Sequence, residues 1–447
     1  MLKVGSSCID ITPTKEVYLG GTAELRKTNK IYSRLYVNTA IIDDGIKKIL
    51  FISLDLLWLN DLFIHDLKKH INKKFSIPET AILICCTHTH NAPSVSKILP
   101  NIPVDIYILD LLKIKIISSI ENAYKNIESV IMGYFSKLIP HSFNRRTIVE
   151  GNILWMGASN QDPPIIDSEG PSDQELISIW FKNNTGKVKT VIVNYSAHPN
   201  NWCFDNIISS DYPGEIKKAL NSHLNQDTAV LFLQGCCGNT GIKNYQLNQY
   251  NKMYDPIEDA IRTGENIAYE IIKNIHINDN YYSNHQYINF TNTSIDVPKR
   301  KINISCFAKA KETLKKVDTS KKHTYTGYNP KEWELYWANS ILALKEDYIN
   351  NKTYNFNFSI FAIGNITVIT NPAEMFVEFQ LCIKKELNLN KIIVAELTNG
   401  YCGYVPTQKS LKNGGYETNH CLSSYLEPVT GEYWVSKSIE EVNKLNI

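Results

Sequence analysis

Two histidines separated by one residue, His88 and His90, directly follow the apolar run of residues 81–86. The run predicts a buried strand, so both imidazoles stand at the end of a sheet. In an extended chain, residues i and i+2 point to the same face, and we therefore expect the two rings to converge. Neutral imidazole is the commonest metal ligand and a usual general acid or base near neutral pH. The pair is typical of a metal-dependent hydrolase.

Further metal-competent side chains follow other apolar strands. Each also has an ordinary interpretation: a hydrogen-bonded histidine, a carboxylate in the first turn of a helix, or an aromatic residue with a satisfied hydroxyl. Singly, none of them establishes a site. These metal-competent side chains are His198 after the predicted strand 188–195, Glu374 after the predicted strand 366–370, and Tyr401 and Tyr404 after the predicted strand 391–397.

Several well-known catalytic motifs are absent from the sequence. A metallo-β-lactamase would need Asp-His where Ala92 and Pro93 stand, and an amidohydrolase barrel needs more histidines than remain. No HExxH, GxSxG or P-loop pattern occurs. The chemistry must therefore come from the strand-end residues.

The 447 residues have an ordinary composition, with 43% hydrophobic residues and a formal charge of +2. This charge gives no reason to expect nucleic acid as a partner. The first ten residues contain no apolar signal region, and no run is long enough to span a membrane. Ten cysteines in a chain of this length do not make a disulfide scaffold. These features predict a cytoplasmic protein with no transmembrane segment.

Alternation of strand-like and helix-like segments predicts an α/β fold, with mixed β-sheets flanked by helices in one domain over residues 1–447. Residues 151–171, rich in Gly, Asn, Asp and Pro, predict an extended loop. Residues 301–352 predict a helical insertion within the domain, because charged, helix-prone sequence replaces strand-like sequence. The expected strands are 36–42, 48–57, 81–86, 129–134, 176–181, 188–195, 228–233, 356–363, 366–370 and 391–397. The expected helices are 60–75, 105–125, 256–275, 308–317 and 330–348.

An ordered series of motifs resembles the neutral, non-lysosomal ceramidase family, specifically its catalytic domain. The motifs span nearly the whole chain in the family's order. They are Ile9-Asp10-Ile11-Thr12-Pro13, Phe51-Ile52-Ser53-Leu54-Asp55-Leu56, Thr87-His88-Thr89-His90-Asn91-Ala92-Pro93, Asn144-Arg145, Tyr195-Ser196-Ala197-His198-Pro199, Ser210-Asp211-Tyr212-Pro213-Gly214, Gln234-Gly235-Cys236-Cys237-Gly238-Asn239, Pro372-Ala373-Glu374 and Tyr401-Cys402-Gly403-Tyr404-Val405-Pro406-Thr407.

The resemblance implies one Zn²⁺ per chain, and its ligands fall on His88, His198, Glu374 and Tyr404. It also implies that His90 and Arg145 stabilise an oxyanion or protonate the leaving amine, with Tyr401 in support. Two imidazoles and one carboxylate leave a position for a water whose pKa falls to roughly 7 on zinc.

The sequence departs from the family at three points. It shows neither a signal peptide nor room for the family's C-terminal immunoglobulin-like domain. Asn239 stands where the family has an aspartate, which removes a carboxylate from any second metal site. Arg146 stands where the family often has serine; it is either a contact for an anionic substrate group or a solvated surface arginine.

The sequence therefore predicts a zinc-dependent amidohydrolase that cleaves a carbon–nitrogen amide bond of a small N-acylated substrate. The alternative enzyme is an esterase or deacetylase acting on an O-acyl or sugar substrate, since both reactions share a tetrahedral intermediate. The alternative from another class is a binding protein with an inherited, inactive site. The oligomeric state is not encoded in any recognisable pattern.

Overall fold

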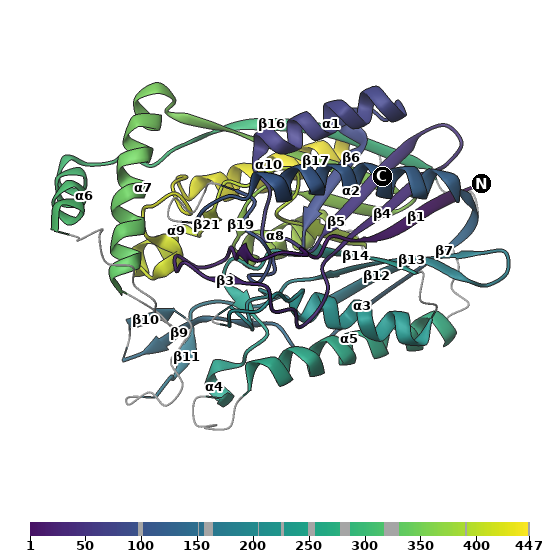
Figure 1. The fold of residues 1–447 in the computed structure, drawn as a ribbon, viewed down its shortest axis with the longest axis horizontal. Helices are drawn as coiled ribbons and strands as arrows, with labels where there is room; N and C mark the ends of the chain where they lie inside the picture. The colour runs from purple at the N-terminus through teal and green to yellow at the C-terminus, as the bar shows by residue number, and fades with distance from the viewer. Residues whose placement is uncertain are drawn as a thin grey trace.

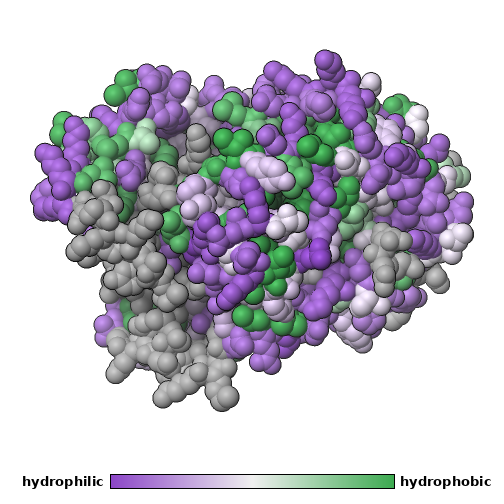
Figure 2. Space-filling view, viewed as in Figure 1, coloured by the Kyte–Doolittle hydropathy of each residue, from purple (hydrophilic) through white to green (hydrophobic). Residues whose placement is uncertain are grey.

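The computed structural model describes residues 1–96, 102–150, 152–155, 164–203, 205–224, 228–248, 255–277, 287–316, 330–388 and 391–445. The predicted mixed α/β architecture is confirmed (Figure 1). Polar side chains cover much of the face in Figure 2, with apolar residues scattered among them, as is usual for a protein surface.

The largest sheet has eight strands in the order β14-β13-β12-β7-β1-β4-β5-β6. Only the terminal pairs, β13–β14 and β5–β6, are parallel. Its two ends fold toward each other, because β14 also packs against β4, β5 and β6 (Figure 1). The strands are β1 (Lys3–Asp10), β4 (Tyr36–Asp43), β5 (Lys48–Leu54), β6 (Ile82–Cys86), β7 (Glu128–Leu138), β12 (Glu175–Asn183), β13 (Val188–Tyr195) and β14 (Ala229–Gln234).

A second sheet has four strands in the order β16-β17-β18-β20. Side chains from both sheets, among them Phe51 and Phe361, belong to one continuous core. Asn194 joins the sheets by donating hydrogen bonds to the carbonyls of Leu233 and Val394. The four strands are β16 (Ile288–Pro298), β17 (Thr353–Ile363), β18 (Ile366–Thr370) and β20 (Ile392–Ala395).

Helices cover opposite sides of the folded sheet (Figure 1). On one side, α1 (Asp61–Phe75) and α2 (Ile106–Lys125) begin at side-chain caps, because Asn60 and Asp105 accept hydrogen bonds from the first-turn amides of Phe63 and Ile108. On the other side, α3 (Asp211–His223) packs against α5 (Pro256–Ile277). The C-terminal α8 (Val377–Leu387) and α10 (Val429–Lys444) pack together.

The predicted helical insertion forms α6 (Ile304–Lys316) and α7 (Pro330–Asn350), which pack against each other. They connect the antiparallel strands β16 and β17 and lie at one end of the molecule (Figure 1). The predicted end of the first helix, Val317, lies outside the described residues. Residues that cluster between the two helices include Ala310, Ala338 and Ile341, so this pair has a small core of its own.

Short elements complete the fold. They are β2 (Val17–Tyr18), β3 (Lys27–Thr28), η1 (Glu79–Ala81), β8 (Phe143–Asn144), β9 (Arg146–Val149), β10 (Asn152–Trp155), β11 (Asp167–Ser168), β15 (Thr240–Gly241), α4 (Tyr245–Asn248), β19 (Glu374–Met375), β21 (Tyr404–Val405), α9 (Gln408–Asn413) and η2 (Tyr416–Thr418).

The extended loop expected at residues 151–171 is partly wrong. Strands β10 and β11 both pair with β9 in a small three-stranded sheet. Strands of two to four residues are too short to show a period in the sequence. Residues 151 and 156–163, which fall within the same expectation, lie outside the described part of the chain.

Among the described residues, no helix combines the length and apolar character that crossing a bilayer requires. All ten cysteines are free thiols, and the vicinal pairs Cys85-Cys86 and Cys236-Cys237 are buried, as expected for small apolar side chains.

Candidate active site

Three histidines converge at the carboxyl ends of β6 and β13. The Nε2 atom of His198 lies 3.1 Å from Nε2 of His88 and 2.9 Å from Nε2 of His90. His88 and His198 are fully buried. Each of these three side chains offers one nitrogen atom as a ligand, and the three atoms lie within 4.8 Å of one another. The described residues can therefore hold a metal ion at this point.

The rings of His88 and His90 converge as expected, but not because they lie on one face of an extended strand. Strand β6 ends at Cys86, and His88 has a positive φ of 69°, in the left-handed region. The His88 and His90 rings therefore meet across a tight turn and not along one face of an extended strand. Their centroids are 4.9 Å apart with an interplanar angle of 82°.

Backbone carbonyls orient all three imidazoles. Nδ1 lies 3.0 Å from the Leu57 carbonyl in His88, 2.7 Å from the Gly21 carbonyl in His90, and 3.2 Å from the Cys237 carbonyl in His198. Because a carbonyl can only accept, each Nδ1 carries the proton and donates it. Each Nε2 then presents a lone pair to the point where the three rings meet.

A positive charge is needed at this point, because three unprotonated nitrogens cannot hydrogen bond to one another. Neither His90 nor His198 is suited to carry that charge as a bound proton. Burial, together with the neighbouring histidines and Arg145, holds the pKa values of His90 and His198 well below their usual range. Imidazoles fixed by backbone acceptors and turned toward one another are instead the arrangement found in metal sites.

Glu374 adds a carboxylate to the three rings. Its Oε2 lies 3.2 Å from His88 Nε2 and 3.9 Å from His198 Nε2. Its Oε1 accepts a hydrogen bond of 2.6 Å from the hydroxyl of Tyr401. Burial raises the pKa of Glu374, but His88 and the two tyrosine hydroxyls outweigh it, so the pKa lies below the usual value and the group is ionised.

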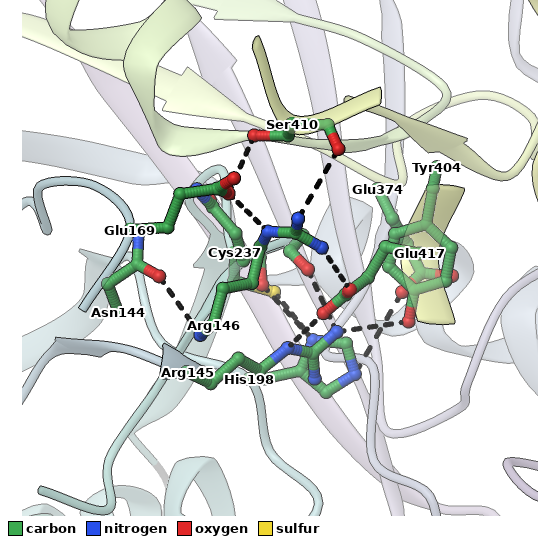
Figure 3. A network of polar contacts seen from close by, with 12 residues as sticks. Asn144, Arg145, Arg146, Glu169, His198, Cys237, Glu374, Tyr404, Ser410 and Glu417 are labelled. Carbon is green, nitrogen blue, oxygen red and sulfur yellow. Dashed lines mark hydrogen bonds and ion pairs between the residues drawn. The ribbon is translucent and has the colours of Figure 1, made fainter. Parts of the chain in front are cut away.

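Tyr404 and Arg145 complete the group. Strands β19 and β21 pair in parallel with Glu374 opposite Tyr404, which brings the phenol beside the carboxylate. The Arg145 guanidinium, 2% exposed, donates to the Tyr404 hydroxyl at 3.1 Å and to the Gly238 carbonyl at 2.8 Å (Figure 3). All seven residues singled out from the sequence therefore lie in one connected cluster.

Arg146 is not a solvated surface residue, so that interpretation of its sequence position is wrong. It is fully buried and donates to the carboxylates of Glu169 and Glu417 (Figure 3). Glu417 also lies 3.4 Å from the Nε atom of Arg145. The two adjacent arginines thus share one carboxylate, which anchors the segment carrying η2 beside the site.

Sequence reasoning did not identify Glu396 at the end of β20. Its Oε1 accepts from the backbone amide of Cys237 at 3.1 Å, and its Oε2 accepts from the amide of Met375 at 2.9 Å. Burial raises the pKa of Glu396 well above its usual value. The residue joins the segment that orients His198 to the segment that carries Glu374. No motif or spacing marks it in the sequence.

Asn239 occupies a structural position. Its side-chain oxygen accepts from the amide of Val377 at 2.9 Å, and its side-chain nitrogen donates to Glu378 at 2.8 Å. An aspartate could not donate to Glu378 and would face a second carboxylate there.

Aromatic residues surround the cluster. Trp58 stacks on Tyr401 with a centroid separation of 4.1 Å, and Tyr416 contacts the ring of Tyr404 at 5.8 Å. Trp333, from helix α7 of the insertion, lies 4.7 Å from Tyr416. The helical insertion therefore reaches the immediate surroundings of the candidate site.

Together, the fold and the cluster define a mixed α/β protein with a buried, metal-competent histidine–carboxylate centre. A scan against protein-family models finds no match, and no curated protein sequence matches either.

The structure resembles the crystal structure of neutral ceramidase from Pseudomonas aeruginosa, with a TM-score of 0.70 and 16% identity, over 98% of this chain and 73% of that chain. A structure of a ceramidase complexed with C2 gives a TM-score of 0.68 and 15% identity, over 97% and 74%. The ceramidase-like fold predicted from the motifs is confirmed.

Proposed function

We propose that this chain is a ceramidase-like, metal-dependent hydrolase that cleaves the amide bond of an N-acylated substrate. One observation carries the proposal: three Nε2 lone pairs, fixed by backbone acceptors, converge beside an ionised carboxylate. The fold similarity to neutral ceramidase supports the reaction class.

The donor set fits zinc. Imidazole nitrogens and a carboxylate oxygen are the ligands that zinc takes in catalytic sites, where an open position remains for water or substrate. We assign His88, His198 and Glu374 as ligands, with Tyr404 as the fourth protein group. Bound zinc would polarise the scissile carbonyl and lower the pKa of a water molecule.

The remaining residues act on charge and protons. Arg145 is a buried cation held by Tyr404 and Gly238, and it is therefore prepared to stabilise an oxyanion without reorganising. His90 can hold or deliver a proton at Nε2, because its Nδ1 is committed to the Gly21 carbonyl. The Tyr401 hydroxyl fixes Glu374 by donating to Oε1.

A second arrangement makes His90 the third imidazole ligand, and its 2.9 Å separation from His198 favours that assignment. The two arrangements differ in what removal of His90 does. In the first, His90→Ala keeps the metal and loses activity. In the second, it loses the metal as His88→Ala does.

Metal content measured by mass spectrometry tests the proposal. The purified wild-type protein should hold about one zinc per chain, and His88→Ala and His198→Ala should hold far less. His70→Ala, an exposed histidine of α1, is the matched control and should retain the metal. A wild-type protein that takes up no metal after incubation with zinc would refute the metal centre.

A panel of N-acyl and O-acyl substrates tests the reaction. Amide hydrolysis should be abolished by a chelator and restored by zinc. Arg145→Lys should lower kcat by about 10²–10³ with unchanged zinc content, because the bidentate guanidinium is lost from the oxyanion position. Turnover of O-acyl substrates alone would establish the esterase alternative, and full activity of Arg145→Lys would refute the oxyanion role.

A further inference from the structure

A cleft with a volume of about 740 Å³ lies between α1 and the four-stranded sheet. Its α1 wall is formed by residues 61, 64, 65 and 68, whose spacing places them on one helix face. The opposite wall belongs to β16 and β17, and η1 closes one side. Most of the lining side chains carry amide, hydroxyl or carboxyl groups, so the cleft is suited to a polar ligand.

Lys68 stands out on the α1 wall of this cleft. Its side chain is 9% exposed, and it forms no hydrogen bond or ion pair with any described residue. Other deeply placed lysines behave differently: Lys217 pairs with Asp55, and Lys384 pairs with Asp173 at 2.7 Å and Glu175 at 2.8 Å. A buried ammonium group without a counter-ion is costly, and a lysine avoids that cost by losing its proton.

The charges around Lys68 do not compensate for its burial. Asp61 and His65 lie on its own helix, Glu79 on η1, Asp296 on β16, and Lys299 beyond β16. Glu79 raises the pKa of Lys68, but burial outweighs it and lowers the pKa to about 7. Lys299 is itself paired with Asp347 at 2.5 Å. A substantial fraction of Lys68 is therefore an unprotonated amine at neutral pH.

We propose that Lys68 is a nucleophilic amine, at a second site outside the histidine centre, that binds a small polar aldehyde covalently as an imine. The cleft supplies the space, and the amine supplies a lone pair that no neighbouring group engages. An anionic ligand is disfavoured, because Asp61, Glu79 and Asp296 would repel it. The proposal does not depend on the proposed hydrolase function.

The reaction balances without an oxidant or reductant. The Lys68 nitrogen attacks the carbonyl carbon, and the carbonyl electron pair moves to oxygen. A proton transfers from nitrogen to that oxygen to give a carbinolamine. The C–O bond then breaks, and nitrogen loses its remaining proton, so that one water leaves as the imine forms.

The cleft shares residues with the loops that carry the candidate active site. Asp61 accepts a hydrogen bond from the Tyr401 amide at 3.1 Å, whereas the Tyr401 hydroxyl donates to Glu374. Pro372 and Asn399, which precede Glu374 and Tyr401, also line the cleft. An occupant of the cleft would therefore lie against the backbone of these loops.

Site-resolved reductive labelling of the full-length wild-type protein tests the proposal. The probe is isotopically labelled glycolaldehyde with cyanoborohydride, which reduces an imine to a stable secondary amine. Peptide mass spectrometry follows each lysine from pH 6 to pH 10. We expect Lys68 to be labelled at least about tenfold faster than its exposed neighbour Lys69 at pH 7, with the advantage shrinking toward pH 10 as ordinary lysines deprotonate.

Lys217 and Lys384 are internal controls and should be labelled slowly, because their amines are buried but ion-paired. Equal labelling of Lys68 and Lys69 at pH 7 would overturn the proposal. A parallel sample contains inorganic phosphate. Protection of Lys68 by phosphate would show a protonated, anion-binding lysine and would also overturn it, whereas unchanged labelling supports it. No variant is required, so failure of a mutant to fold cannot obscure the result.

Discussion

At the scale of single residues, the candidate site depends on where each proton resides. Three carbonyl oxygens, from Gly21, Leu57 and Cys237, fix the Nδ1 protons and thereby turn three Nε2 lone pairs inward. Glu374 is fixed in the same way by the Tyr401 hydroxyl. The ligands are thus oriented before any ion binds, which reduces the entropy that binding must overcome.

The depressed pKa of His198 predicts a pH effect on stability. Below about pH 6.5, the unfolded chain protonates this imidazole and the folded protein does not, so acid favours unfolding. In metal-stripped protein, the free energy of unfolding of the wild type should fall relative to His198→Gln by about 1.4 kcal/mol per pH unit below pH 6.5.

Urea unfolding at pH 7.5, 6.5 and 5.5 measures this effect. His70→Gln, which alters an exposed histidine, should follow the wild type at each pH. If the difference between the wild type and His198→Gln is the same at all three pH values, His198 does not resist protonation in the folded protein.

At the scale of elements, short ladders and close contacts decide where the site residues lie. The two-residue parallel pair β19–β21 sets Glu374 opposite Tyr404, and His88 occupies the tight turn after β6. The longer strands behind them must hold their register, because His88, His198 and Glu374 follow shortly after the ends of β6, β13 and β18. Register in turn depends on close packing between the sheet and its helices.

Gly5 illustrates that packing. A Cβ atom at Gly5 would lie 2.0 Å from the Ala123 carbonyl oxygen of α2, which is a clash with backbone. Gly5→Ala should therefore lower the free energy of unfolding by about 1–3 kcal/mol, by forcing α2 away from β1. Gly241→Ala is the control, since its Cβ would meet nothing within 4 Å. Denaturant midpoints compare the two variants, and an unaffected Gly5→Ala would show that α2 can shift freely.

At the scale of the whole molecule, the candidate metal centre joins segments that are distant in the sequence. His88 is 110 residues from His198 and 286 residues from Glu374. The two histidines follow strands of the eight-stranded sheet, whereas Glu374 follows β18 of the four-stranded sheet. A bound ion would thus connect the two sheets as well as serve chemistry.

Zinc should accordingly stabilise the folded protein. A ligand that binds only the folded state contributes about 2.7 kcal/mol at one hundred times its Kd. Differential scanning fluorimetry should therefore show a higher Tm after zinc addition to metal-stripped protein. The shift should be absent in His88→Ala and preserved in His65→Ala, an exposed residue of α1. An equal shift in His88→Ala would place the zinc elsewhere.

Much of the architecture was predictable from the sequence, for identifiable reasons. Long apolar runs such as residues 48–57 and 81–86 mark strands, and the helix-like segments 60–75 and 105–125 correspond to α1 and α2. Strand β1 was not predicted, because its Gly5, Ser6 and Ser7 weaken the apolar pattern. Helix α3 was not predicted because Pro213 and Gly214 occur in its first turn, where a proline is tolerated.

The sequence by itself determined which residue types stand at the ends of apolar strands, and the motif order placed His88, His90, Arg145, His198, Glu374, Tyr401 and Tyr404 in one set. Only the tertiary structure decided how they meet. The left-handed turn at His88, the burial of Arg146 between Glu169 and Glu417, and the bridging role of Glu396 all depend on partners 21 to 271 residues away or on backbone conformation. Such contacts leave no local pattern, because their energy arises from burial in the folded chain.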